Sequence, residues 1–145
     1  MKPEADQILG LSAFQLLGTL APLLPNAYAQ GTASLISFMM MLSAQEYERA
    51  ADIRAKENAD MRALFARAAP KLRDAELRSK LQEAAHEAES SLEISALNAA
   101  NYKLRRLLIA LHEHADREGD RAASKDVWAL LKRLADRRFL KVPGQ

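Results

Sequence analysis

The pattern of apolar and charged positions divides the chain at residue 45. Residues 7–45 contain no Asp, Glu, Lys or Arg, a run of 39 positions, whereas charges recur every few residues further on. Pro22 and Pro25 interrupt this run, and proline does not continue the interior of a helix. The pattern therefore predicts a first helix that ends before residue 24 and a long second helix over about 32–69.

A helical repeat of apolar residues follows in the second half of the chain. Successive members are three or four positions apart, which is the spacing of one helix face; they are Leu77, Leu81, Ala84, Ala88, Leu92, Ser95, Ala99 and Tyr102. Asp74 is a favourable N-cap and Gly119 a favourable residue beyond a helix end. The repeat predicts one long helix over about 75–117, then a shorter one to about Leu140 that Trp128 is expected to anchor.

Composition agrees with a fold made of helices alone. Alanine (28 residues) and leucine (23) dominate, whereas isoleucine, valine and threonine together number nine. Alanine and leucine favour helices, and β-branched residues favour strands. We predict an all-α fold, an antiparallel bundle of about four helices of which two are long (about 32–69 and 75–117). The bundle forms a single domain over 1–145 and is completed by dimerisation.

The uncharged run has three interpretations. A membrane span needs about 20 mostly apolar residues, and the 17 uncharged positions of 8–24 include two glycines and a proline and lack a basic flank. A secretory signal is suggested by Ala-Tyr-Ala before Gln30, but the leading segment is acidic rather than basic. The third interpretation, cover by other protein, is favoured. It predicts an oligomer interface or pocket formed by Leu35, Ile36, Met39, Met40 and Leu42.

Four polar residues lie within the predicted long helices, where their side chains need hydrogen-bond partners. Asn98 and Asn101 stand in the most apolar part of the second long helix, although asparagine is a poor helix former. Tyr47 and Asn58 hold comparable places in the first. We predict that these four form a buried polar layer that fixes the register between the helices. Lining of a ligand pocket is the alternative role.

The residues that usually carry chemistry do not form a recognisable site. The absence of cysteine excludes disulfides, thiolate nucleophiles and cysteine-ligated metals. Glu83 and His86 have the E-x-x-H spacing of di-iron bundles, but those proteins need this spacing on two helices. His112 and His114 are two positions apart and do not share a helix face. We predict no catalytic residue, no metal site and no cofactor.

The charge balance points away from nucleic acid. The chain carries 21 basic and 19 acidic residues, for a net charge of +2. Bases are enriched in 125–145, but no recognised nucleic-acid module accompanies them. We predict a cytoplasmic, non-enzymatic helical protein that self-associates, as a homodimer, and that binds another protein. The alternative is a small-molecule or lipid-binding bundle with a methionine-rich apolar pocket, and contact with a membrane is a lesser one.

Overall fold

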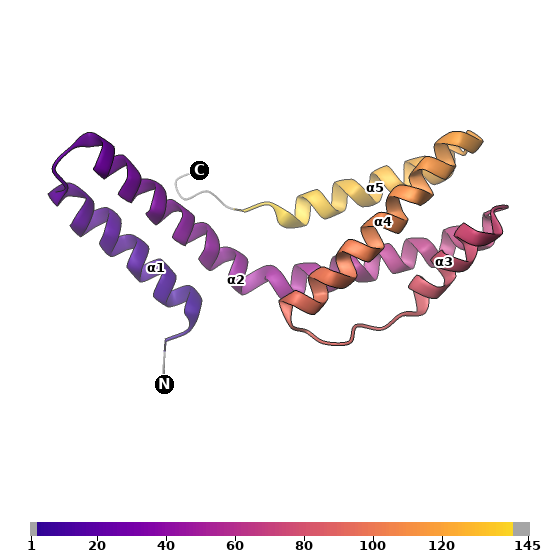
Figure 1. Ribbon diagram of the computed structural model, residues 1–145, viewed down its shortest axis with the longest axis horizontal. Helices are drawn as coiled ribbons and strands as arrows, with labels where there is room; N and C mark the ends of the chain where they lie inside the picture. The colour runs from indigo at the N-terminus through magenta and orange to yellow at the C-terminus, as the bar shows by residue number, and fades with distance from the viewer. Residues whose placement is uncertain (1–2, 141–145) are drawn as a thin grey trace. The chain divides into compact units, whose positions relative to one another are not determined.

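The computed structural model describes residues 3–140, and every regular element within them is helical (Figure 1). There are five α-helices rather than about four. In chain order they are α1 (Ala5–Gln15), α2 (Ala27–Ala68), α3 (Ala75–His86), α4 (Ile94–Glu118) and α5 (Arg121–Arg138). The all-α prediction is confirmed for the described residues, and the two longest helices are α2 and α4.

The chain divides into two compact units. The N-terminal unit comprises residues 3–50 together with Leu140, and the C-terminal unit comprises residues 51–139. Helix α2 contributes its first part to the N-terminal unit and its second part to the C-terminal unit.

The N-terminal unit is a helical hairpin. Helix α1 continues through a π-helical turn (Leu16–Leu20) and a 3-10 turn (Ala21–Leu23), in which Pro22 ends the helical path. The chain then turns, and the side chain of Asn26 accepts a hydrogen bond from the backbone N–H of Ala29 at 2.8 Å. This cap explains why α2 begins at residue 27, five residues before the predicted start.

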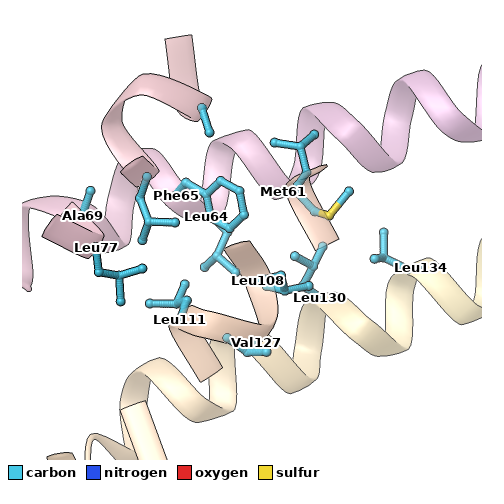
Figure 2. Close-up of a cluster of buried hydrophobic side chains, with 13 residues drawn as sticks. Met61, Leu64, Phe65, Ala69, Leu77, Leu108, Leu111, Val127, Leu130 and Leu134 are labelled. Atoms are coloured by element: carbon cyan, nitrogen blue, oxygen red, sulfur yellow. The ribbon is translucent and has the colours of Figure 1, made fainter. Parts of the chain in front are cut away.

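The C-terminal unit is organised around one apolar core (Figure 2). The second part of α2, the 3-10 turn that follows it (Ala69–Lys71), and the helices α3, α4 and α5 supply the buried side chains. Their positions follow the three- and four-residue steps that the sequence shows, so each helix turns its apolar face inward. The core consists of Met61, Leu64, Phe65, Ala69, Leu77, Leu81, Ala84, Leu104, Leu108, Leu111, Val127, Leu130 and Leu134.

The prediction of one helix over 75–117 is wrong, because the chain leaves helical geometry at 87–93. Glutamates at positions 83, 87, 89 and 93 have no base among them in this stretch, and glutamates four apart on a helix repel each other. The hydroxyl of Ser91 also accepts a hydrogen bond from the backbone N–H of Glu93 at 3.0 Å, a local alternative to helical pairing. As a result Ala88 and Leu92, expected on the apolar face, are exposed.

A tight turn joins α4 to α5. Gly119 has a φ of +68°, in the left-handed region that glycine adopts without strain. The N–H of Asp120 donates to the carbonyl of Ala115 at 2.8 Å, and the Asp120 side chain accepts from Ala122 and Ala123 at the start of α5. Trp128 on α5 is 61% exposed, so it does not anchor the helix as predicted.

Candidate functional site

The N-terminal hairpin packs through its smallest side chains. Helix α1 and the first part of α2 run antiparallel (Figure 1), and their buried residues include Ala13, Ala33 and Ser37, which expose 1%, 5% and 0% of their surface. The hydroxyl of Ser37 donates to the carbonyl of Ala33 within α2. Small residues allow two helix backbones to approach closely. The fully buried positions of the hairpin are therefore small residues, whereas larger side chains such as Leu9, Leu16 and Phe38 are half-buried.

Other large apolar side chains of the hairpin are exposed to solvent. Ten of them expose between 42% and 86% of their surface. We call them the apolar hairpin surface, and they are Ile8, Leu11, Phe14, Leu17, Leu20, Leu23, Tyr28, Leu35, Ile36 and Met39. Isolated exposed apolar residues are ordinary, but a group of ten within 32 consecutive positions and without one charged side chain among them is typical of a surface that contacts something apolar.

The residues predicted for an oligomer interface divide into two groups. Leu35, Ile36 and Met39 are 61%, 48% and 55% exposed and belong to the apolar hairpin surface. Met40 and Leu42 are half-buried. No helix within residues 3–140 has both the length and the apolar content that crossing a bilayer requires.

Two of the four residues predicted for a polar layer are bonded to each other in the C-terminal unit. The amide Nδ2 of Asn101 on α4 donates to Oδ1 of Asn58 on α2 at 2.8 Å, and both side chains are buried. Asn98 instead accepts a hydrogen bond from Nε of Arg54 at 2.8 Å. Tyr47 belongs to the N-terminal unit and is 58% exposed. The structure thus brings together Asn58 and Asn101 within the C-terminal unit.

The central member of this polar group is Glu57, which the sequence analysis did not identify. Its side chain is fully buried, and its two carboxylate oxygens accept hydrogen bonds from Nε and Nη2 of Arg138, each at 2.6 Å. Asn101 donates to the same carboxylate at 3.1 Å, and Nη2 of Arg105 lies 3.4 Å away. We call Glu57, Asn58, Asn101, Arg105 and Arg138 the Glu57 cluster.

One feature of the sequence does indicate that Glu57 is buried. Ile53, Glu57, Met61 and Phe65 are four residues apart, and all four are buried, so Glu57 stands on the core-facing row of α2. Because Glu57 stands among other charged residues in the sequence RAKENAD, it resembles an ordinary solvent-exposed glutamate. A carboxylate at this position of an apolar row needs basic partners, and α4 and α5 supply them.

The cluster also holds the segment between α3 and α4. Nδ2 of Asn58 donates to a carboxylate oxygen of Glu89 at 3.0 Å and to the carbonyl of Leu97 at 3.2 Å. The same Glu89 carboxylate forms an ion pair with Arg62. Every polar atom of the two asparagine side chains at 58 and 101 therefore has a partner, as buried amides require.

The charges around Glu57 set its pKa. Burial alone raises the pKa of this carboxyl, but the hydrogen bonds and positive charge of Arg138, with Arg105 and Asn101, outweigh burial and hold the pKa below its ordinary value of 4.5. The ionised form of the Glu57 side chain is therefore more favourable in the folded chain than in the unfolded chain. Its contribution to stability is complete above about pH 4.5 and is lost as the pH falls through the folded-state pKa.

Acid titration tests this assignment. The difference in free energy of unfolding between the native chain and the variant Glu57→Gln is expected to be constant from neutral pH to about pH 5, and to shrink as the pH falls further. Urea denaturation followed by circular dichroism at a series of pH values measures it. A difference that is unchanged at low pH would contradict a charged Glu57 in the folded state.

The other candidates from the sequence do not come together as sites. Within the described residues, no group of three or more histidine or acidic side chains has metal-binding geometry, and Nδ1 of His86 lies 2.7 Å from the carbonyl of Gln82. His112 contacts Ser124 and the ring of Trp128. Of the C-terminal bases, Arg133 and Arg137 approach Asp60 and Arg138 binds Glu57; residues 141–145 lie outside the described part.

The chain was compared with known protein families, with curated proteins and with solved structures, and none of them matches it.

Proposed function

We propose that this chain is a non-enzymatic helical protein that self-associates through the apolar hairpin surface, with a second copy of the chain as the occupant. The observation that carries the proposal is the exposure of ten large apolar side chains on a hairpin whose fully buried residues are all alanine or serine. In this proposal the second copy completes an antiparallel helical bundle, with the homodimer as the smallest assembly. The Cys-free composition fits a cytoplasmic location.

The exposed apolar area is of the size that a stable dimer needs. Fully covering a large apolar side chain removes on the order of 100 Å² from water. Ten such side chains, about 60% exposed on average, present roughly 600 Å² of apolar area. Standard interfaces bury about 800 Å² on each partner, of which a little over half is apolar. The hairpin can supply that area by itself.

The composition of the hairpin favours cover by protein over contact with a lipid surface. A helix that lies on a membrane combines an apolar face with a polar face rich in lysine and arginine. Residues 7–45 contain no lysine or arginine, so the hairpin has no such basic face.

The oligomeric mass of the purified full-length chain tests the proposal. Light scattering coupled to gel filtration is expected to give at least twice the mass of 16.1 kDa. The double variant Leu35→Glu/Met39→Glu places two charges on exposed positions of α2 and is expected to be monomeric with unchanged helical content, because desolvating a charge in an apolar interface is costly.

The matched control is Leu92→Glu, which adds a charge at a 73% exposed leucine of the C-terminal unit and is expected to keep the native mass. A monomeric native chain at micromolar concentration would refute self-association. A double variant that retains the native mass would place the contact elsewhere.

A second candidate function is the binding of an apolar small molecule or lipid. The observation in its favour is the run Met39-Met40-Met41 beside Phe38, because flexible methionines adapt to varied apolar ligands. Native mass spectrometry of the purified chain distinguishes the two. A retained ligand adds mass to each copy, whereas self-association gives integer multiples of the chain mass.

A further inference from the structure

A second apolar surface, separate from the hairpin, lies on α4 and α5 in the C-terminal unit. Tyr102, Ile109 and Trp128 are 66%, 58% and 61% exposed. Tyr102 and Ile109 are seven residues apart on α4, two turns on the same face. The Trp128 ring stands edge-on to His112 with centroids 5.4 Å apart. Aromatic residues such as these are enriched in the energetically important parts of protein interfaces.

A hollow lies between the two helices. A half-open apolar cavity of about 270 Å³ is lined by Arg105, Leu108, Ile109, His112, Val127 and Leu131. Its floor is rigid, because Leu108 and Val127 belong to the buried core. Pockets for drug-sized ligands are commonly about 300–1,000 Å³. A cavity at or below this range fits one or two bulky side chains of a partner helix better than a separate ligand.

Basic side chains predominate at the rim. Arg105 lines the cavity and is 33% exposed, and exposed Arg106, Lys125 and Lys132 stand within one helical turn of Ile109 or Trp128. The rim acids on α4 are Glu113 and Asp116, and Asp116 already lies 3.8 Å from His112. Arg106, Lys125 and Lys132, which lie outside the Glu57 cluster, outnumber these two acids and give the surface a positive balance. Asp126 of α5 instead lines another cavity, with Leu64 and Arg67. Charge complementarity therefore selects an acidic partner.

We propose that the groove between α4 and α5 binds an acidic amphipathic helix of another protein. One apolar residue of that helix enters the cavity over Leu108 and Val127, and a second packs on Trp128 and Ile109. Its flanking carboxylates face Arg105, Arg106 and Lys132. This is the helix-in-groove mode of recognition, in which apolar anchors at i, i+4 and i+7 fill a groove between helices. The site is independent of self-association through the hairpin.

A designed peptide provides the probe. It is a helical peptide of about 15 residues with leucines at i, i+4 and i+7 and glutamates at the flanking positions. Trp128 is the only tryptophan, so its fluorescence reports binding to the full-length chain directly, and calorimetry gives the affinity. We expect saturable binding with a Kd of about 10–100 µM, and at least about tenfold weaker binding of the same peptide with lysine for glutamate.

Four variants locate the contact. Ile109→Glu and Trp128→Ala, both at exposed positions, are expected to weaken binding at least about tenfold. Leu92→Ala, the control at an exposed leucine outside the groove, is expected to bind like the native chain. The hairpin variant Leu35→Glu/Met39→Glu is also expected to bind normally, whether or not it changes the oligomeric mass.

Each contrary result overturns the proposal. No saturable binding below about 1 mM would show that the groove takes no such helix. Equal affinity for the acidic and basic peptides would remove the charge argument on which the choice of partner rests. Loss of binding in the hairpin variant with native affinity in Ile109→Glu would place the peptide on the N-terminal unit instead.

Discussion

Replacing Glu57 with glutamine is expected to lower the free energy of unfolding at pH 7 by about 3 kcal/mol, the lower end of what removal of one partner from a buried ion pair costs. The carboxylate is fully buried and accepts two 2.6 Å hydrogen bonds from Arg138, with Arg105 and Asn101 also on it. Glutamine retains the volume but not the charge. The loss is limited because Arg138 and Arg105, at 40% and 33% exposure, can turn toward water.

The measurement is urea denaturation of the two chains, and the matched control is Glu76→Gln. Glu76 also forms an ion pair, with Lys80 at 2.5 Å, but both side chains are more than half exposed. Exposed pairs contribute about 0–1 kcal/mol, so this variant is expected to be nearly as stable as the native chain. Equal losses in the two variants would show that burial of Glu57 does not determine its contribution.

Replacing Leu130 with alanine is expected to lower the free energy of unfolding by about 3–4 kcal/mol, within the range measured for buried leucines. Leu130 of α5 is 0% exposed and lies beside Leu108 in the core (Figure 2). The surrounding helices are fixed by the Glu57 cluster and by the turn at Gly119. They therefore cannot fully close the space that the missing side chain leaves.

Leu92→Ala is the control for this core substitution. The side chain of Leu92 is 73% exposed, so its truncation is expected to change the free energy of unfolding by less than about 0.5 kcal/mol. Denaturation of both variants, monitored by circular dichroism, gives the comparison. Similar values for the two leucines would contradict the placement of α5 against α2 and α4 in the C-terminal unit.

The helices themselves could be predicted because their signals are local. Leu77, Leu81 and Ala84 are buried where the three- and four-residue spacing places them, whereas Ser95, Ala99 and Tyr102 of the same predicted row are exposed on α4. Asp74 caps α3 through the N–H of Leu77 at 3.0 Å, and Gly119 follows α4, as expected. Side-chain spacing and cap chemistry depend on neighbours within one or two turns, which the sequence shows directly.

The break at 87–93 depends on partners that are distant in sequence. The apolar spacing continues through Ala88 and Leu92, and no proline or glycine marks a break. What favours the non-helical path is the binding of Glu89 by Asn58 and Arg62, about 30 residues earlier on α2. Local repulsion among the glutamates weakens the helix, but only the folded chain supplies these two partners.

The sequence by itself determined that the chain is helical and that residues 7–45 are uncharged, since both follow from the order of apolar, charged and capping residues. Only the tertiary structure decided which side chains that hairpin uses for itself. Alanine and serine lie inside and Leu11, Phe14 and Leu35 outside, an arrangement that depends on how closely two helices approach. The tertiary structure likewise decided that Glu57 forms an ion pair with Arg138, 81 residues further along the chain, because such a pair exists only once α5 has packed on α2.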